Sequence, residues 1–212
     1  VYENGKKTSY KSKNIVIATG SSSSSLPGIE IDEKNIISST GALTLSQVPK
    51  NLLVIGGGYI GLEMGSVWSR LGSEVTVIEY LDFITPGMDR EISNEFKKIL
   101  TKQGIKFQLG SKVNSLKNTG SKVTINYTNI KNSKDEILEV DKALISVGRK
   151  PYTEGLNLTK VGVKKDNKGR IEVNEKLQTS IQNIYAIGDV IKGPMLAHKA
   201  EEEGIAVAEI LA

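Results

Sequence analysis

The sequence predicts an α/β fold built on a parallel sheet with an antiparallel meander. One observation is a strand–helix–strand succession, in which apolar runs at 52–55 and 75–79 flank helical periodicity over 59–71. Another is a series of three short segments of alternating hydrophobicity, separated by Gly, Asn and Ser residues, a pattern typical of antiparallel strands. These segments centre on Val113, 123–125 and 137–138.

Further elements are expected on both sides of this meander. A second amphipathic helix is predicted over 89–103, with Gly104 as its end signal. Apolar runs at 105–109 and 143–147 predict two more buried strands. The residues expected on the buried face of the helix are Ile92, Phe96, Ile99 and Leu100.

The two ends of the chain are expected to form a separate region. A buried strand over 15–20 stops at Gly20 and leads into a serine-rich stretch at 21–25, which we interpret as a flexible bend. Beyond Pro151 the pattern predicts a charged hairpin, a strand and a terminal helix. The strand is expected at 184–187, the helix at 195–211, and the domain boundaries at 1–25, 26–150 and 151–212.

Composition excludes several classes of protein. With 38% hydrophobic residues and no apolar run of about 18 residues, the chain is not expected to enter a membrane. A net charge of +4 and 5% aromatic residues argue against nucleic-acid binding. The chain has no Cys and one His, so neither a metal centre nor cysteine redox chemistry is expected within it. Because it starts at Val1 without a targeting signal, we expect an excised fragment.

The turn after the first strand of the strand–helix–strand unit is rich in glycine. Gly56 permits a tight turn, Gly58 lets the backbone approach a pyrophosphate, and Gly61 lets the helix pack close to the strand. Gly65, one turn later, extends that close packing. Unpaired N–H groups at the helix start favour an anion. The alternative is a tight turn with no ligand, but the flanking strand and helix favour a Rossmann-like dinucleotide site.

Glu79 ends the second strand of this unit. A carboxylate there accepts the two hydroxyls of an adenine ribose and repels the additional phosphate of NADP. No Arg follows in the turn 80–82. The sequence therefore favours NAD, although a solvated strand end is the alternative interpretation of Glu79.

Several longer segments resemble the pyridine nucleotide-disulfide oxidoreductases, and within them the dihydrolipoamide dehydrogenase family. The resemblance is carried by 18–20, 61–68, 147–149, 179–189 and 194–204. The Ala-Thr-Gly segment 18–20, the glycine-rich turn and the Gly-Asp pair 188–189 are shared across the wider group of flavoproteins, whereas 195–204 is specific to the lipoamide branch. The resemblance spans essentially the whole chain. It implies that 1–25 and 151–212 belong to an FAD-binding domain and 26–150 to an NAD-binding domain.

The resemblance also implies cofactor contacts. Glu63 corresponds to a carboxylate near the nicotinamide, with a solvated helix residue as the alternative, and Tyr59 to a lid over the flavin, with simple packing as the alternative. Met195 begins a helix whose positive end lies at the flavin pyrimidine edge. The NAD contacts implied are Gly56, Gly57, Gly58, Tyr59, Ile60, Gly61, Leu62, Glu63, Glu79, Val113 and Gly148. The FAD contacts implied are Thr19, Gly20, Ser21, Asp189, Met195, Leu196, Ala197 and His198. For Asp189, a helix-capping role is the alternative.

No catalytic residue is expected within the chain. The family's base lies in a C-terminal His-Glu motif and its redox pair is two cysteines, neither of which this sequence contains, so His198 is not expected to act as the base. The resemblance implies that a longer parent oxidises dihydrolipoamide as a homodimer with FAD and NAD. It also implies the lipoyl domains of 2-oxo acid dehydrogenase complexes as partners, and the bacterial cytoplasm or mitochondrial matrix as location.

Two alternatives stay open at this point. One is another FAD- and NAD-dependent disulfide reductase or an NADH oxidase, against which segment 195–204 argues. The other is a non-catalytic nucleotide-binding module. Yellow flavin absorbance in the longer gene product would distinguish an enzyme from such a module.

Overall fold

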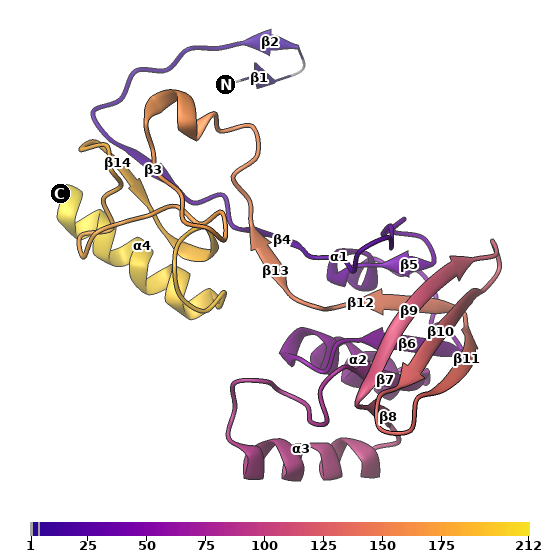
Figure 1. Ribbon diagram of the computed structural model, residues 1–212. Helices are drawn as coiled ribbons and strands as arrows, with labels where there is room; N and C mark the ends of the chain where they lie inside the picture. Colours follow the sequence, from indigo (N-terminus) through magenta and orange to yellow (C-terminus); the bar gives the residue numbers. More distant parts are fainter. Residues whose placement is uncertain (1, 4) are drawn as a thin grey trace. The chain divides into compact units, whose positions relative to one another are not determined.

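The structure is a computed structural model that describes residues 2–3 and 5–212. It consists of two compact units (Figure 1). One unit consists of the described residues up to Ser22 together with Arg149–Ala212. The other unit is Ser23–Gly148. The predicted α/β class, with a parallel sheet and an antiparallel meander, is confirmed.

A five-stranded parallel sheet forms the centre of the unit Ser23–Gly148. From the central strand, the next two strands along the chain lie on one side, and the first and last strands of the sheet lie on the other. In spatial order the strands are β5 (Ile36–Ile37), β12 (Lys142–Ile145), β6 (Asn51–Ile55), β7 (Glu74–Glu79) and β8 (Lys106–Leu109). Their carboxyl ends meet at one edge of the sheet.

Three helices pack on one face of this sheet. In β6, Leu52 and Val54 point to the helices, where they meet Leu62 and Leu100 in one hydrophobic core. Side chains at alternate strand positions face the same side, which explains this spacing. The helices are α1 (Ser39–Leu43), α2 (Tyr59–Arg70) and α3 (Arg90–Lys102), with Ser38 and Asp89 accepting backbone N–H groups as N-caps of α1 and α3.

The predicted face of α3 is wrong in part. Ile92 and Ile99 are 56% and 51% exposed, whereas Leu100 is buried. Ser93 is buried in place of Ile92, and its hydroxyl is within 2.8 Å of the Thr85 hydroxyl. Because the two hydroxyls satisfy each other, the helix can turn this polar residue inward, and the hydrophobic pattern alone does not reveal it.

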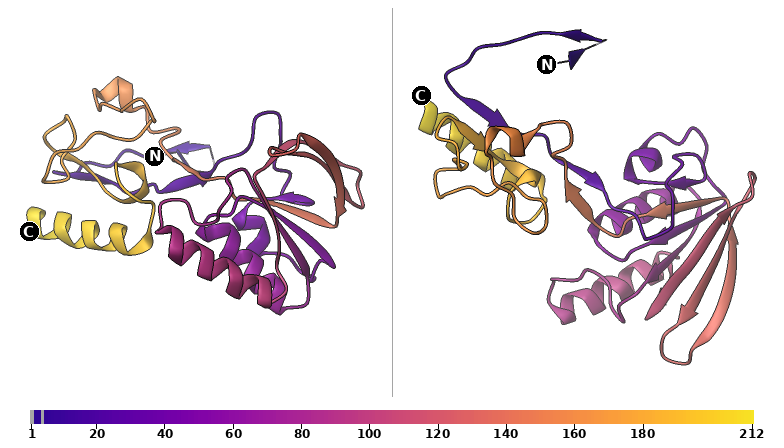
Figure 2. Two further views of the ribbon diagram at one scale, coloured as in Figure 1. Left: turned by 60° about the horizontal axis from the view of Figure 1, so that its bottom comes forward. Right: turned by 45° about the horizontal axis from the view of Figure 1, so that its top comes forward.

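The antiparallel meander covers the opposite face of the parallel sheet, as Figure 2 shows. Leu53 and Ile55 of β6, the positions that alternate with Leu52 and Val54, pack there against Ile125 and Tyr127. The unit is therefore a three-layer structure of helices, parallel sheet and meander. The meander strands are β9 (Ser111–Asn118), β10 (Val123–Asn129) and β11 (Lys134–Val140).

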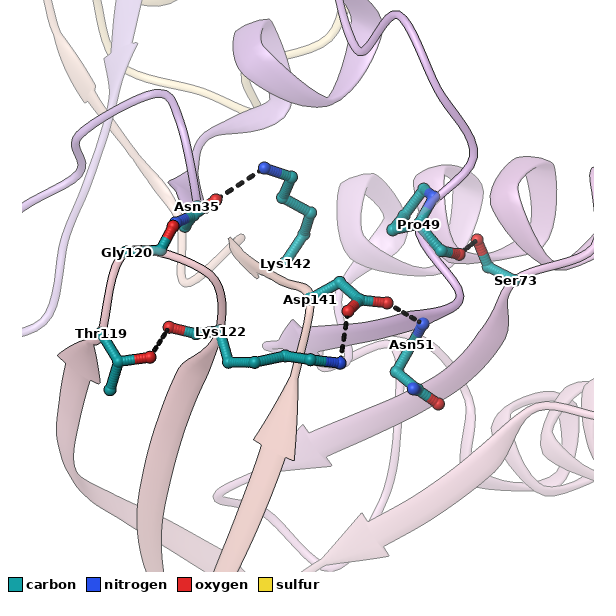
Figure 3. A network of polar contacts seen from close by, with 9 residues as sticks. All are labelled: Asn35, Pro49, Asn51, Ser73, Thr119, Gly120, Lys122, Asp141 and Lys142. Carbon is teal, nitrogen blue, oxygen red and sulfur yellow. Dashed lines mark hydrogen bonds and ion pairs between the residues drawn. The ribbon is translucent and has the colours of Figure 1, made fainter.

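A network of polar side chains links the meander to the parallel sheet (Figure 3). Asp141, between β11 and β12, accepts from Lys122 Nζ at 2.6 Å and from the Asn51 N–H at 2.8 Å. Asn35 donates to the Gly120 carbonyl at 3.0 Å and accepts from Lys142 Nζ at 2.6 Å. The network thus holds the amino ends of the strands together, away from the edge where their carboxyl ends lie.

The other unit is built from short strands and one long helix. β3 (Ile15–Ile17) pairs in parallel with β14 (Ile184–Ala186), close to the prediction for both. Ser21–Ser23 form β4, which pairs with β13 (Arg149–Pro151), so the predicted flexible bend is wrong at these residues. The strand could not be predicted from the serine-rich composition, because the strand that pairs with it lies far away in the sequence.

Smaller elements complete this unit. The charged hairpin is represented by an antiparallel bridge between Lys165 and Ile171, with Arg170 paired to Asp166 in its turn. α4 spans Ala197–Leu211, so the helix begins two residues later than predicted. The others are β1 (Tyr2–Glu3), β2 (Lys6–Lys7) and the 3-10 helices η1 (Leu158–Val161) and η2 (Gly188–Val190). Across residues 2–3 and 5–212, no helix has the length and apolar character needed to cross a bilayer.

Asp141 offers a test of the polar network. The hydrogen bond from Lys122 holds the pKa of Asp141 below its ordinary value of 3.8. A carboxyl group with a lowered folded pKa stabilises the fold above its unfolded pKa, and this contribution disappears as the pH falls through the folded pKa. Asp141→Asn is therefore expected to lower the free energy of unfolding by about 1 kcal/mol at about pH 6, and by less below about pH 4.

Urea unfolding at several pH values measures this difference. The matched control is Glu30→Gln, the same change of charge at an exposed position of the same unit. An unchanged difference between wild type and Asp141→Asn from about pH 6 to about pH 3 would contradict the proposed ion pair.

Candidate nucleotide-binding site

The turn between β6 and α2 is shaped by the close approach of β12. Gly56 has a positive φ of +108° and donates its N–H to the Ile78 carbonyl at 2.9 Å. A Cβ atom on Gly56 would lie only 2.5 Å from the Ser146 carbonyl oxygen. Both the conformation and the lack of space require glycine at this position.

Gly61 lets the first turn of α2 pack against the strands. A Cβ there would lie 2.5 Å from Ser146 Oγ and 2.9 Å from Val54 Cγ1. A Cβ on Gly65 would make ordinary contacts, at 3.4 Å from Val75 and 3.5 Å from Val54. Gly61 is therefore essential to the approach, whereas Gly65 permits it without being indispensable.

Ser146 was not singled out by the sequence. It follows β12, and its hydroxyl donates to the Ile55 carbonyl at 2.9 Å. This bond ties the end of β12 to the start of the glycine-rich turn. Neither its residue type nor its local sequence distinguishes Ser146, since its partner lies 91 positions earlier in the chain.

Gly58 differs from its glycine neighbours because its Cβ direction is open. No protein atom lies within 4 Å of the position that a Cβ would take. Gly58 is also the N-cap of α2, and as a glycine it contributes no side-chain cap. A helix start with open space and no side-chain cap suits an anionic ligand.

Glu79 points toward the glycine-rich turn from the carboxyl end of β7. Its side chain accepts the Gly57 N–H at 2.5 Å and the Leu81 N–H at 2.8 Å, and the residue is only 9% exposed. An ionised carboxylate offers about four acceptor positions, so about two remain for further donors. The carboxylate is held rigidly beside the turn.

The other residues expected at this site differ in exposure. Tyr59 is 48% exposed, and Glu63 is exposed one turn later on α2, while Ile60 is half-buried. Leu62 lies in the helix-side core, so only its backbone faces the turn region. Val113 packs on the meander-side core, and Gly148, with φ +124°, accepts the Ser24 N–H at 3.0 Å.

A second cluster lies in the unit that contains α4. Asp189, in η2, accepts from the Ser21 hydroxyl at 2.5 Å, and Ser21 Oγ accepts from Arg149 Nε at 2.6 Å. Thr19 donates its hydroxyl to the Tyr152 carbonyl at 2.5 Å, and the Gly20 carbonyl accepts the Tyr152 N–H at 2.9 Å. The sequence did not single out Arg149 as a functional residue.

The N-cap residue of α4 makes no side-chain cap hydrogen bond. Leu196 is the N-cap, and Met195 precedes it in non-helical conformation. Ala197 and His198 form the first helical residues and are exposed. The uncapped N–H groups give this helix start a positive potential.

The fold and the glycine-rich turn together define a dinucleotide-binding α/β protein of the Rossmann type. The chain belongs to the pyridine nucleotide-disulphide oxidoreductase family, whose model matches residues 1–204.

Curated relatives agree with this family. The chain is 56% identical over 208 residues to the mitochondrial dihydrolipoyl dehydrogenase of Pisum sativum, and 57% identical to the dihydrolipoamide dehydrogenase of Chaetomium thermophilum. Each match covers 98% of this chain but only 42% and 41% of the relatives. The resemblance inferred from the sequence is confirmed, and the chain spans about two fifths of the length of these relatives.

Solved structures of the same kind superpose on the chain. LpdA from Mycobacterium tuberculosis matches with a TM-score of 0.87 at 27% identity, over 98% of this chain and 44% of that protein. The flavoprotein disulfide reductase RclA from Escherichia coli matches with a TM-score of 0.84 at 31% identity, over 94% of this chain and 45% of that one.

Two glycines of the turn make a matched pair for mutation. Gly61→Ala is expected to lower the free energy of unfolding by about 2 kcal/mol, because the added methyl overlaps Ser146 and Val54. Gly58→Ala is expected to change it by less than about 1 kcal/mol, because its φ of −78° and open surroundings accommodate a methyl. Denaturant unfolding of both variants measures the contrast, and equal losses would argue against the close approach at Gly61.

Proposed function

We propose that the chain is the NAD-binding portion, with part of the FAD-binding portion, of a dihydrolipoyl dehydrogenase. The observation that carries the proposal is the carboxylate of Glu79, bonded to the Gly57 N–H beside the open helix start at Gly58. This pairing of a fixed acid with a helix start that has no side-chain cap suits a nucleotide with one diphosphate and a ribose that keeps both hydroxyls.

The residues of the glycine-rich turn fit a bound NAD. The N–H groups at the start of α2 take the pyrophosphate, and Glu79 takes the adenine-ribose hydroxyls with its remaining acceptor positions. Glu63 and Tyr59 face the nicotinamide end, and Val113 and Gly148 border the two ends of the nucleotide. When bound, the nicotinamide supplies a hydride acceptor. The protein's own contribution is to fix the ligand's position and to exclude water.

The second cluster fits a flavin nucleotide. Asp189 is an acceptor-only group, and Ser21 holds one of its oxygens, so the carboxylate suits hydroxyls of the FAD ribityl or ribose. The backbone at Thr19, Gly20 and Ser21 lies next to this carboxylate in the same unit. The start of α4, from Met195 to His198, supplies a positive helix end toward the flavin ring. When bound, the flavin supplies the electron relay between thiols and nicotinamide.

In this proposal, the two compact units correspond to two cofactor domains. The domain boundaries expected from the sequence were 1–25, 26–150 and 151–212, and the compact units change at Ser22 and Gly148. We assign Ser23–Gly148 to the NAD-binding domain and the remainder of the chain to the FAD-binding domain.

The complete reaction belongs to a longer protein. Oxidation of dihydrolipoamide in this family needs a pair of cysteines and a histidine base, and the chain has no Cys. We propose that the parent works as a homodimer with the lipoyl domains of 2-oxo acid dehydrogenase complexes. Because relatives are named as mitochondrial, we favour the mitochondrial matrix as the location of the parent, with the bacterial cytoplasm as the alternative.

A second candidate is another reductase of the same family. A leghemoglobin reductase from Glycine max is 55% identical over 207 residues, close to the value for the dehydrogenases. Activity of the full-length protein with dihydrolipoamide and NAD, measured beside reduction of a ferric haem protein, distinguishes these two candidates.

The NAD assignment predicts the effect of mutating the acid. Glu79→Ser with Tyr80→Arg is expected to shift the ratio of kcat/KM for NAD and NADP toward NADP at least about tenfold, because the repelling charge is replaced by a phosphate partner. Glu79→Gln serves as a control, since it retains an acceptor for the Gly57 N–H while removing the charge. An unchanged ratio in the double variant would contradict the role of Glu79.

Because the sequence has no Cys, this polypeptide is expected to lack the complete dehydrogenase activity. The isolated 212 residues are expected to show no dihydrolipoamide-dependent NADH formation, because they have no Cys to accept electrons from the substrate. NADH absorbance measured with and without dihydrolipoamide tests this expectation, and the full-length enzyme is the positive control. Substrate-dependent turnover by the 212 residues would refute it.

A further inference from the structure

The turn that bears Asp189 packs directly on α4. Gly188 begins this turn in η2 with a positive φ of +73°. A Cβ on Gly188 would lie 3.2 Å from the Cβ of Ala200 in the first half of α4. The backbone next to Asp189 therefore lies against the helix surface at short range, within reach of the side chains on either side of Ala200.

Two charged side chains of α4 bind the backbone on both sides of Gly188. Glu203 Oε2 accepts the Gly188 N–H at 2.7 Å. Lys199 Nζ donates to the Gly188 carbonyl at 3.2 Å, and this carbonyl belongs to the peptide that joins Gly188 to Asp189. Lys199 and Glu203 also pair with each other at 2.8 Å, one helical turn apart.

This ion pair is shielded from water. The side chains of Lys199 and Glu203 are only 15% and 18% exposed, compared with 54% and 58% for the ion pair of Arg90 and Asp82. A Cβ on Gly193 would lie 3.3 Å from Lys199 Cδ, so the loop after η2 passes over the lysine stem. The lysine is thus confined between α4 and this loop.

Energetics argue that the pair does more than hold the helix in place. Burying two charges costs about as much desolvation as the pair returns, so apolar residues would serve stability equally well. Charged groups specify a geometry more strictly, because their hydrogen bonds are directional and an unpaired member is costly. Here the geometry that they specify is that of the two peptide groups flanking Gly188, the second of which leads into Asp189.

We propose that Lys199 and Glu203 are positioning residues that orient Asp189 toward hydroxyl groups of the flavin nucleotide. The inference rests on the proposed role of Asp189 as an FAD ligand. Neither side chain needs to touch the cofactor: they hold the peptide groups on either side of Gly188, and the Ser21 hydroxyl donates to Asp189 Oδ2.

The test measures FAD affinity of the full-length apoprotein by quenching of flavin fluorescence. Glu203→Met removes the acceptor of the Gly188 N–H while retaining the length of the side chain, and it is expected to weaken FAD binding at least about tenfold. Glu203→Gln keeps an acceptor and is expected to stay within about threefold of wild type. Glu202→Met, the same change at the exposed neighbouring position, is the matched control.

A double-mutant cycle separates positioning from general stabilisation. If Glu203 acts through Asp189, adding Glu203→Met to Asp189→Ala causes little further loss of FAD affinity. Additive losses would overturn the inference, as would a loss of affinity in Glu202→Met equal to that in Glu203→Met. If Glu203→Met does not fold, Lys199→Met, which removes the donor to the Gly188 carbonyl, takes its place in the cycle.

The same measurements distinguish failure of the inference from failure of the proposed function. Full FAD affinity in Asp189→Ala would overturn the assignment of Asp189 itself, and the positioning role with it. Weakened binding in Asp189→Ala together with wild-type binding in Glu203→Met would overturn only the positioning role.

Discussion

The structure of the larger unit depends on one close approach, that of the first turn of α2 to the ends of β6 and β12. Gly56 and Gly61 make it possible, and the Ser146 hydroxyl binds the strand ends together. The approach brings the helix start to the edge of the sheet where Glu79 lies. The carboxylate then accepts the Gly57 N–H beside the open helix start at Gly58.

The rest of this unit keeps that edge of the sheet rigid. Alternate residues of β6 enter two different cores, one under the helices and one under the meander. The sheet is therefore covered on both faces, as a parallel sheet requires. The polar network of Asp141, Lys122 and Asn35 lies at the opposite ends of the strands, so this network and the glycine-rich turn occupy different edges of the sheet.

In the unit that contains α4, side-chain hydrogen bonds fix the position of a carboxylate. A turn with a positive φ carries Asp189, and the conformation of such a short turn is poorly fixed by its own backbone. Contacts from Ser21 and from α4 supply the missing constraint. Both units thus present a carboxylate whose position depends on hydrogen bonds made by residues distant in the sequence.

The sequence by itself determined the α/β class and the strand–helix–strand unit, because these depend on local periodicity and on glycine spacing. Its longer segments carried the resemblance to the family. It also predicted a binding role for Glu79, from its place at the end of a predicted strand, and for Asp189, from the family resemblance. The tertiary structure decided what depends on distant partners: the strand at Ser21–Ser23, the inward face of α3 at Ser93, and the contacts of Ser146, Arg149 and Glu203. Ordinary polar residues like these gain a role only when folding brings a partner within hydrogen-bonding distance, and no local pattern records that partner.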